Sequence, residues 1–319
     1  MIVTLTPNPS VDRTVEVDAL VRGTVARVRG SRIDPGGKGV NIAGALMANG
    51  HDAIAVLPSG GLEGMELARL LEAEGILSVQ VPIAGSIRAN ITLAEADGTV
   101  TKFNEPGPHL SLGEVEALIQ ASTDAAVGAQ WVVGCGSLPP GPADDFYSLV
   151  VDRLGRSDTK VAIDTSGAAL LKSLSAGPDV IKPNLEELAE AASVEIATLG
   201  DSLRAARALQ DQGVATVIAS LGVDGALYVD DLVAVHAEAE VVRPRSAVGA
   251  GDALLAGFLA HGGHGIEAFT HGVAWAAAAV SLPGSSTPGP GNVDLSIVHV
   301  HDHVETGRVL GKDVKVGKG

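Results

Sequence analysis

The stretch Val248-Gly249-Ala250-Gly251-Asp252 decides how the rest of the sequence is interpreted. A largely apolar run, 253–258, follows it, which places Asp252 at the start of a helix. Two glycines just before a helix allow a tight turn and leave the first N–H groups of the helix open to an anion. An aspartate in such a pocket suits the role of holding a hydroxyl that attacks a phosphoryl group. The same five residues also fit an aspartate that only caps the helix.

Strands and helices alternate through the region that leads to this stretch. Helix 113–126 precedes strand 130–134, helix 142–155 precedes strand 160–164, and helices 251–262 and 266–281 end the series. This alternation with short loops predicts a mostly parallel sheet that is covered by helices on both faces. Ligands on such sheets bind beyond the carboxyl ends of the strands.

The first third of the chain contains a different pattern. Residues 14–34 read as short, highly charged strands, and segments 90–95 and 99–105 flank the hairpin turn Ala96-Asp97-Gly98. A sheet with polar residues on both sides does not belong in a core, so these segments predict a flap over the site. The segment 304–319 is rich in Gly and Lys and is expected to be a flexible tail.

Composition limits the class of protein. The 319 residues are 46% hydrophobic, enough for one large α/β domain or two small ones. Only 3% are aromatic and the net charge is −16, which argues against a nucleic-acid partner. A basic island at 22–38 could still attract small phosphorylated ligands. A single cysteine, the absence of an 18-residue apolar run and the lack of a signal-like N-terminus predict a cytoplasmic protein that does not contact membranes.

Two further stretches carry chemistry. The glycine loop at 36–39 opens a helix, but it lacks the spacing of a Walker A loop, and no strand leads into G-x-G-x-x-G. In Lys182-Pro183-Asn184-Leu185-Glu186-Glu187, proline begins a helix and places Asn184 and Glu187 one turn apart. An amide and a carboxylate at this spacing could hold water ligands of Mg²⁺. The spacing fits a capping box equally well.

Together these motifs resemble those of the ribokinase-like carbohydrate kinases, the PfkB family. The resemblance covers nearly the whole chain and rests on two signatures, Gly36-Gly37-Lys38-Gly39-Val40-Asn41 and Val248-Gly249-Ala250-Gly251-Asp252-Ala253. Within the family the chain is most similar to the hexose-phosphate branch of 1-phosphofructokinases and tagatose-6-phosphate kinases. Asn8-Pro9-Ser10, Ser86-Ile87-Arg88-Ala89-Asn90 and Phe103-Asn104-Glu105-Pro106-Gly107 carry this narrower resemblance.

The resemblance implies a single domain, 1–319, with a three-layer α/β/α sandwich, a mostly parallel central sheet and a small β lid. The lid would comprise segments 12–34 and 86–105, and such lids often mediate homodimers. The implied activity is ATP- and Mg²⁺-dependent phosphorylation of fructose 1-phosphate at its 6-hydroxyl, which gives fructose 1,6-bisphosphate. Tagatose 6-phosphate or fructose 6-phosphate is the alternative substrate. A non-catalytic sugar-phosphate-binding protein on the same scaffold is the alternative function.

The family's functional residues map onto this chain motif by motif. The resemblance makes Asp252 the base and assigns the anion hole to Gly249, Ala250 and Gly251. The residues that should face the sugar phosphate are Asp12, Gly37, Lys38, Asn41, Arg88, Asn104 and Ser137. Those that should lie along the nucleotide are Lys182, Asn184, Ser220, Gly222 and Gly225, with Asn184 and Glu187 near Mg²⁺ through water. The chain departs from some relatives at Gly23, where Thr24 follows in place of a phosphate-binding lysine.

Overall fold

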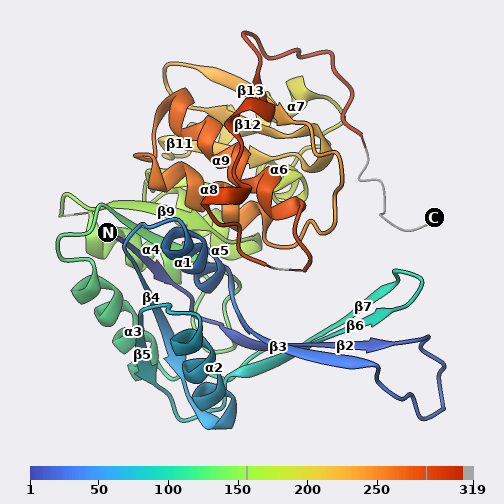
Figure 1. Cartoon of the computed structure of the whole chain (residues 1–319). Helices are drawn as coiled ribbons and strands as arrows, with labels where there is room; N and C mark the ends of the chain where they lie inside the picture. The colour runs from blue at the N-terminus through green and yellow to red at the C-terminus, as the bar shows by residue number, and fades with distance from the viewer. Residues whose placement is uncertain (156, 285, 312–319) are drawn as a thin grey trace.

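A ten-stranded sheet lies at the centre of the molecule, and helices alternate with its strands along the chain (Figure 1). The computed structural model describes residues 1–155, 157–284 and 286–311. The strands of this sheet are β1 (Ile2–Leu5), β4 (Ala53–Ser59), β5 (Ser78–Pro82), β8 (Trp131–Cys135), β9 (Lys160–Asp164), β10 (Val180–Ile181), β11 (Thr216–Ser220), β12 (Ala226–Val229), β13 (Ala234–Ala239) and β14 (Val298–Val300). Their spatial order is β14-β13-β12-β11-β10-β9-β8-β1-β4-β5.

The seven strands from β5 to β11 in this order run parallel, and β12 to β14 extend the sheet with antiparallel pairs. β1 and β8 are buried along their whole lengths, as expected for central strands of a sheet covered on both faces. Because these strands are parallel, their carboxyl ends meet at one edge of the sheet. The loops that follow β1, β8, β9, β10 and β11 therefore come together there.

Helices cover both faces of the central sheet. One buried cluster joins the sheet to α1 (Lys38–Ala48), α2 (Gly61–Ala73), α8 (Ala250–Ala260) and α9 (Gly265–Val280). A second joins its other face to α3 (Leu112–Ala125), α4 (Phe146–Leu154), α5 (Gly167–Leu174), α6 (Leu185–Ala192) and α7 (Leu199–Gln210). The predicted three-layer sandwich with a mostly parallel sheet is confirmed.

A separate four-stranded sheet projects from the body (Figure 1). It consists of β2 (Ser10–Val17), β3 (Gly30–Gly36), β6 (Arg88–Glu95) and β7 (Val100–Asn104), in the order β3-β2-β6-β7. Two antiparallel hairpins form its halves, and they join through a parallel pairing of β2 with β6. The small sheet thus arises from the segments in which the sequence predicts a flap.

The two faces of the small sheet differ in polarity. Residues that pair across neighbouring strands project from the same face. Asp12 pairs with Asn90, and Asn90 pairs with Asn104, which gives one face a polar row. On the other face, Ile91 pairs with Phe103, and both are exposed apolar side chains.

Residues 304–311 pack against the body of the molecule. The Leu310 side chain is buried, and its N–H donates a hydrogen bond to the Ala197 carbonyl oxygen (3.0 Å). Arg308 forms an ion pair with Glu238 on β13 (2.8 Å). This packing differs from the flexible tail expected over 304–319, because the Gly and Lys content hid an apolar anchor and the ion pairs of Arg308 with Glu238 and Asp224. Residues 312–319 lie outside the described residues.

A helix must be both long and apolar to cross a membrane. Among the residues that the structure describes, no helix has the length and apolar character needed to cross a bilayer.

Candidate active site

The turn before α8 presents Asp252 at the carboxyl edge of the sheet. Gly249 is the N-cap residue of α8 and has φ +81°, in the left-handed region that favours glycine. Asp252, in the first turn, is only 8% exposed. Burial and repulsion by the Asp164 carboxylate raise the pKa of Asp252 to about 6, although the Asn41 side chain opposes this by donating a 2.7 Å hydrogen bond to Asp252 Oδ2. A carboxylate with this pKa is a better proton acceptor at neutral pH than an ordinary aspartate.

The first turn of α8 also provides backbone N–H groups. Ala253 donates the first intrahelical hydrogen bond, to the Gly249 carbonyl oxygen (2.9 Å), so the N–H groups of Gly251 and Asp252 precede the helical ladder. A Cβ atom added at Gly251 would lie 3.1 Å from Lys182 Nζ. The buried Lys182 ammonium is therefore next to the turn, and an anion held there would meet both the N–H groups and a positive charge.

The glycine loop at 36–39 fits closely against the end of β1. Gly37 has φ +128°, and a Cβ atom there would lie 2.8 Å from Thr6 Cγ2. The loop leads directly from β3 into α1, and the Asn41 N–H donates to the Gly37 carbonyl oxygen (3.0 Å). This tight connection places Asn41 one turn into α1, where its amide reaches Asp252.

Asp164, at the end of β9, is the central acid of the site and was not among the residues proposed from sequence. It is fully buried, and Lys38 Nζ donates a 2.6 Å hydrogen bond to its Oδ1. Lys182 Nζ lies 3.2 Å from its Oδ2. Burial opposes the charge of Asp164, but these two ammonium groups hold its pKa below the ordinary value. The signal in the sequence was an aspartate at the carboxyl end of the apolar run 161–163.

Asn184 and Glu187 form the capping box that their spacing allows. Glu187 N–H donates to Asn184 Oδ1 and Asn184 N–H donates to Glu187 Oε2, both at 2.8 Å. The second carboxylate oxygen, Oε1, points the other way and lies 3.9 Å from Lys38 Nζ. The cap occupies one oxygen of Glu187 and leaves the other directed at the site, so the capping and metal interpretations are compatible.

The carboxylates of Asp164 and Glu187 suit a hard cation such as Mg²⁺. Asp164 Oδ2 is buried and forms an ion pair with Lys182 Nζ (3.2 Å), but it accepts no well-aligned hydrogen bond from the described residues. Groups of three or more potential side-chain metal ligands do not occur in the described part of the chain. This pattern matches the usual way in which Mg²⁺ binds, through one or two carboxylates together with substrate phosphates and water.

The polar row of the small sheet begins beside the glycine loop. Ser10 Oγ donates to Asp12 Oδ1 (2.6 Å), and Asn90 Nδ2 donates to the same oxygen (3.0 Å). Asn104 is the next residue along this row, on the same face. Asn90 belongs to the motif Ser86-Ile87-Arg88-Ala89-Asn90, but no role was predicted for it. The structure shows that its amide orients Asp12.

Asn8 contacts both Arg88 and Ser137 at the base of the small sheet. The Arg88 guanidinium donates to the carbonyl oxygens of Asn8 (3.0 Å) and Glu105 (3.1 Å), and its Nε is buried with no partner among the described residues. Asn8 Nδ2 in turn lies 3.4 Å from Ser137 Oγ. A half-buried arginine whose donors are not all used is equipped to take an anion.

The residues expected along the nucleotide line the neighbouring strand ends. Ser220 N–H donates to the Pro183 carbonyl oxygen (3.0 Å), which joins the loop of Lys182 and Asn184 to the end of β11. Gly222 begins a short 3₁₀ turn, Gly222–Asp224, and Gly225 ends it with φ +82°. A Cβ atom at Gly225 would lie 2.8 Å from Glu238 Cα, so packing alone explains that glycine.

Comparison with known proteins identifies this arrangement. A family model described as pfkB family carbohydrate kinase matches residues 5–291. The chain belongs to the PfkB family. It is 39% identical over 306 residues to the 1-phosphofructokinase of Haloferax volcanii, which covers 94% of this chain and 97% of that protein. It is also 37% identical over 290 residues to ATP-dependent 6-phosphofructokinase isozyme 2 of Mycobacterium tuberculosis, with coverages of 89% and 85%.

Solved structures show the same fold. The PfkB chain matches phosphofructokinase-2 from Escherichia coli in complex with potassium with a TM-score of 0.86 and 30% identity, over 91% of this chain and 96% of that one. The family and these relatives show that the protein is an ATP-dependent sugar-phosphate kinase, as the sequence predicted.

Proposed function

We propose that this kinase transfers the γ-phosphoryl group of ATP to the 6-hydroxyl of fructose 1-phosphate and forms fructose 1,6-bisphosphate. The observation that carries the proposal is the position of Asp252, which lies in the first turn of α8 and accepts a hydrogen bond from the Asn41 amide. Several relatives named 1-phosphofructokinase, at 31–39% identity, favour fructose 1-phosphate as the acceptor.

The chemistry assigned to this chain is mainly positioning and charge neutralisation. Asp252 accepts the proton of the attacking hydroxyl, and Asn41 orients its carboxylate. The N–H groups of Gly249, Ala250 and Gly251 bind the oxygens of the phosphoryl group during transfer, and the neighbouring Lys182 ammonium adds positive charge.

The sugar would lie between the small sheet and the glycine loop. Asp12 and Asn104 face its hydroxyl groups from the polar row, and Gly37 allows it to approach the backbone. Arg88, with Ser137 nearby, binds the phosphate that the sugar already carries. The small sheet acts as a lid that excludes water, which protects ATP from hydrolysis.

The nucleotide would extend from α8 along the ends of β10 and β11. Lys182, Asn184, Ser220, Gly222 and Gly225 line this path. Asp164 and Glu187 would hold Mg²⁺, with Asn184 acting through water. When bound, Mg²⁺ neutralises charge on the nucleotide phosphates.

A panel of phosphorylated and free sugars, assayed by ADP release, tests the proposal. We expect kcat/KM for fructose 1-phosphate to exceed that for free fructose by at least ~10³, because charge-assisted contacts contribute about 1.5–3 kcal/mol each. It should also exceed the values for fructose 6-phosphate and tagatose 6-phosphate. A preference for fructose 6-phosphate would instead assign the activity named for the Mycobacterium tuberculosis relative. Absence of ADP release with every sugar would favour a sugar-phosphate-binding protein.

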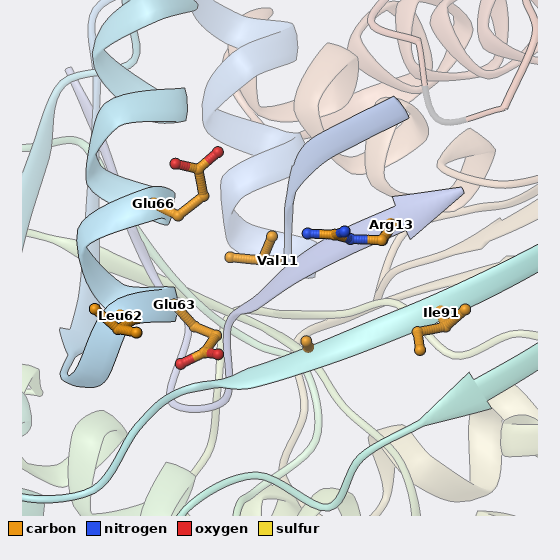
Figure 2. A pocket seen from close by; sticks show the side chains of 7 residues that line it. Val11, Arg13, Leu62, Glu63, Glu66 and Ile91 are labelled. Carbon is orange, nitrogen blue, oxygen red and sulfur yellow. The ribbon is translucent and has the colours of Figure 1, made fainter. Parts of the chain in front are cut away.

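We also propose that the lid pairs with a second copy of this chain through its apolar face. A cavity of about 410 Å³ lies on that face, between the lid and α2. Figure 2 shows Arg13 and Ile91 on the lid strands opposite Glu63 and Glu66 on the helix. An Escherichia coli relative at 30% identity is described as a tetrameric form, which supports self-association.

A further inference from the structure

Lys38 reaches a different part of the site from the one expected. The sequence assigns Lys38 to the phosphorylated sugar, whose existing phosphate is assigned to Arg88. In the structure Lys38 Nζ contacts Asp164 Oδ1 (2.6 Å) and faces Glu187 Oε1 (3.9 Å). These are the two carboxylates that suit a divalent cation. The Lys38 ammonium thus occupies the acidic end of the site rather than the base of the lid.

The surroundings hold this ammonium strongly in its charged form. Burial opposes the charge, but the carboxylates of Asp164, Glu187 and Asp252 raise the pKa of Lys38 well above its ordinary value. Asp164 already has a second cation in Lys182, at 3.2 Å from its other oxygen. Asp164 would therefore keep a partner if Lys38 moved away.

The two lysines differ in their freedom to move. The Lys182 side chain is only 4% exposed, whereas that of Lys38 is 33% exposed. Lys38 is also the first residue of α1, where the helix dipole repels a positive charge. Among the described residues, the contacts of its ammonium are with carboxylates, so a cation that competes for these carboxylates would release it.

We propose that Lys38 is the resident cation of the metal site. In the free enzyme its ammonium holds Asp164 and Glu187 together. When a divalent cation takes these carboxylates, the ammonium turns to the phosphoryl group that is being transferred. Lys38 is then a catalytic residue that contacts the transferred group and not a ligand of the sugar's existing phosphate. This inference rests on the proposed function, because it assumes phosphoryl transfer at Asp252.

The exchange of the Lys38 ammonium for a divalent cation is tested by measuring the affinity for Mn²⁺ with electron paramagnetic resonance. The measurement is made without nucleotide or sugar. Lys38→Met removes the competing charge and keeps an unbranched side chain of similar length. We expect it to tighten Mn²⁺ binding at least ~10-fold. Lys172→Met removes the same charge from an exposed position on α5 and should change the affinity less than ~2-fold. Unchanged or weaker Mn²⁺ binding in Lys38→Met would overturn the proposal.

A second variant locates the effect and guards against misfolding. Glu187→Gln should weaken Mn²⁺ binding in the original chain and should remove most of the gain in Lys38→Met. If Lys38→Met does not fold, Lys38→Gln is used in the same measurement. A gain that persists fully without the Glu187 carboxylate would place the metal elsewhere and contradict the exchange.

Steady-state kinetics separate the two roles of Lys38. As a catalytic residue, its loss should lower kcat ~10- to 100-fold while KM for fructose 1-phosphate stays within ~3-fold. If Lys38 were instead a ligand of the sugar's phosphate, its removal would raise KM for fructose 1-phosphate. It would also reduce the ratio of kcat/KM for fructose 1-phosphate to that for free fructose. That second result would overturn the inference. The proposed substrate is judged separately, by the sugar panel on the unaltered enzyme.

Discussion

At the scale of single residues, Asp252 combines a catalytic advantage with a cost in stability. Its carboxylate is almost completely buried, and burial with repulsion by Asp164 raises its pKa from the ordinary value of 3.8 to about 6. Each pKa unit corresponds to about 1.4 kcal/mol, so holding this charge at neutral pH costs at most about 3 kcal/mol of folding free energy. The charge that makes the residue a base is therefore one that the fold opposes.

We expect Asp252→Asn to lower kcat by roughly 10²–10⁴ and to raise the melting temperature at pH 7–8. The amide keeps the size of the side chain, and its oxygen can still accept the hydrogen bond that Asn41 donates. Steady-state assays and thermal unfolding of the same preparation check both parts. A variant with near-normal kcat would contradict the role of base, and one with a lower melting temperature would contradict the cost assigned to the buried charge.

The pKa of Asp252 also predicts opposite pH dependences for activity and stability. The base must be deprotonated, so kcat/KM should fall as pH decreases through about 6. The folded state binds this proton more tightly than the unfolded state does. The contribution of Asp252 to stability is therefore largest below about pH 4 and declines as pH rises to about 6. Asp252→Asn should remove this decline, which unfolding measurements from pH 4 to pH 8 would show.

Arg88 can be tested against an exposed arginine. Arg88→Ala removes the guanidinium whose Nε has no partner among the described residues. We expect kcat/KM for fructose 1-phosphate to fall by an amount that corresponds to a loss of about 2–4 kcal/mol in transition-state stabilisation. The KM for ATP should stay within about 2-fold. Arg69→Ala, which loses only a surface ion pair with Glu66, is the control. An equal loss for both substrates would mean that Arg88 mainly holds Asn8 and Glu105 together.

At this scale the sequence predicted motif residues but not their partners. The glycine turn placed Asp252 correctly at the start of α8, because the signal is local. Asp164 lies 88 positions before it, and only the folded sheet brings the end of β9 beside α8. The direction of the Lys38 side chain was equally hidden, since it depends on an acid 126 positions away.

At the scale of elements, the start of α6 serves both the helix and the site. Glu187 Oε2 completes the capping box while Oε1 faces Lys38. Because Gln can also complete a capping box, the two functions can be separated by substitution.

We expect Glu187→Gln to raise the Mg²⁺ concentration needed for half-maximal rate and to leave the melting temperature almost unchanged. Glu187→Ala should have the same effect on Mg²⁺ and should also lose about 1 kcal/mol of stability, because the cap is broken. Rates measured over a Mg²⁺ series, with thermal melts of both variants, check this. Equal loss of stability in the two variants, without a change in Mg²⁺ dependence, would leave Glu187 with a structural role alone.

Elements were predicted well where the sequence carried clear periodicity and end signals. Strand 160–164 agrees with β9, and the helix expected to begin in the stretch 182–187 agrees with α6. α5, over Gly167–Leu174, was not predicted: it is as short as α6, but its N-cap makes no side-chain hydrogen bond, so its sequence lacks a start signal. The parallel pairing of β2 with β6 could not be predicted either, since it joins two hairpins that are distant in sequence.

At the scale of the whole molecule, the apolar face of the lid determines the expected assembly. Ile91 and Phe103 are paired neighbours there and are 42% and 53% exposed. A second copy would cover them. We expect Ile91→Asp combined with Phe103→Asp to shift the protein towards the monomer in sedimentation at micromolar concentration.

Leu232→Asp provides the control for this assembly. Leu232 is 89% exposed in the turn between β12 and β13, far along the chain from the lid. This variant should leave the sedimentation profile unchanged. An unaltered protein that sediments as a monomer, or a lid variant that does not dissociate, would contradict pairing through the lid.

The layered architecture was predictable because its pattern repeats along the chain, whereas the packing of residues 304–311 depends on single contacts. Leu310 and Arg308 anchor a segment whose composition indicated the opposite. A pattern of strands and helices that recurs along the chain can be recognised even when single elements are missed. The contacts of single residues such as Leu310 and Arg308 do not change the composition of a segment, so composition cannot predict them.

The parallel pairing of β2 with β6 has a consequence for the order of folding. Its two hairpins are separated by α1, β4, α2 and β5, so the pairing closes a loop of more than 70 residues. Closing such a loop costs conformational entropy that only neighbouring elements, once docked, can offset. The lid is therefore expected to assemble late, after the central sheet. Its amides should be the last in the described chain to gain protection from hydrogen exchange during refolding.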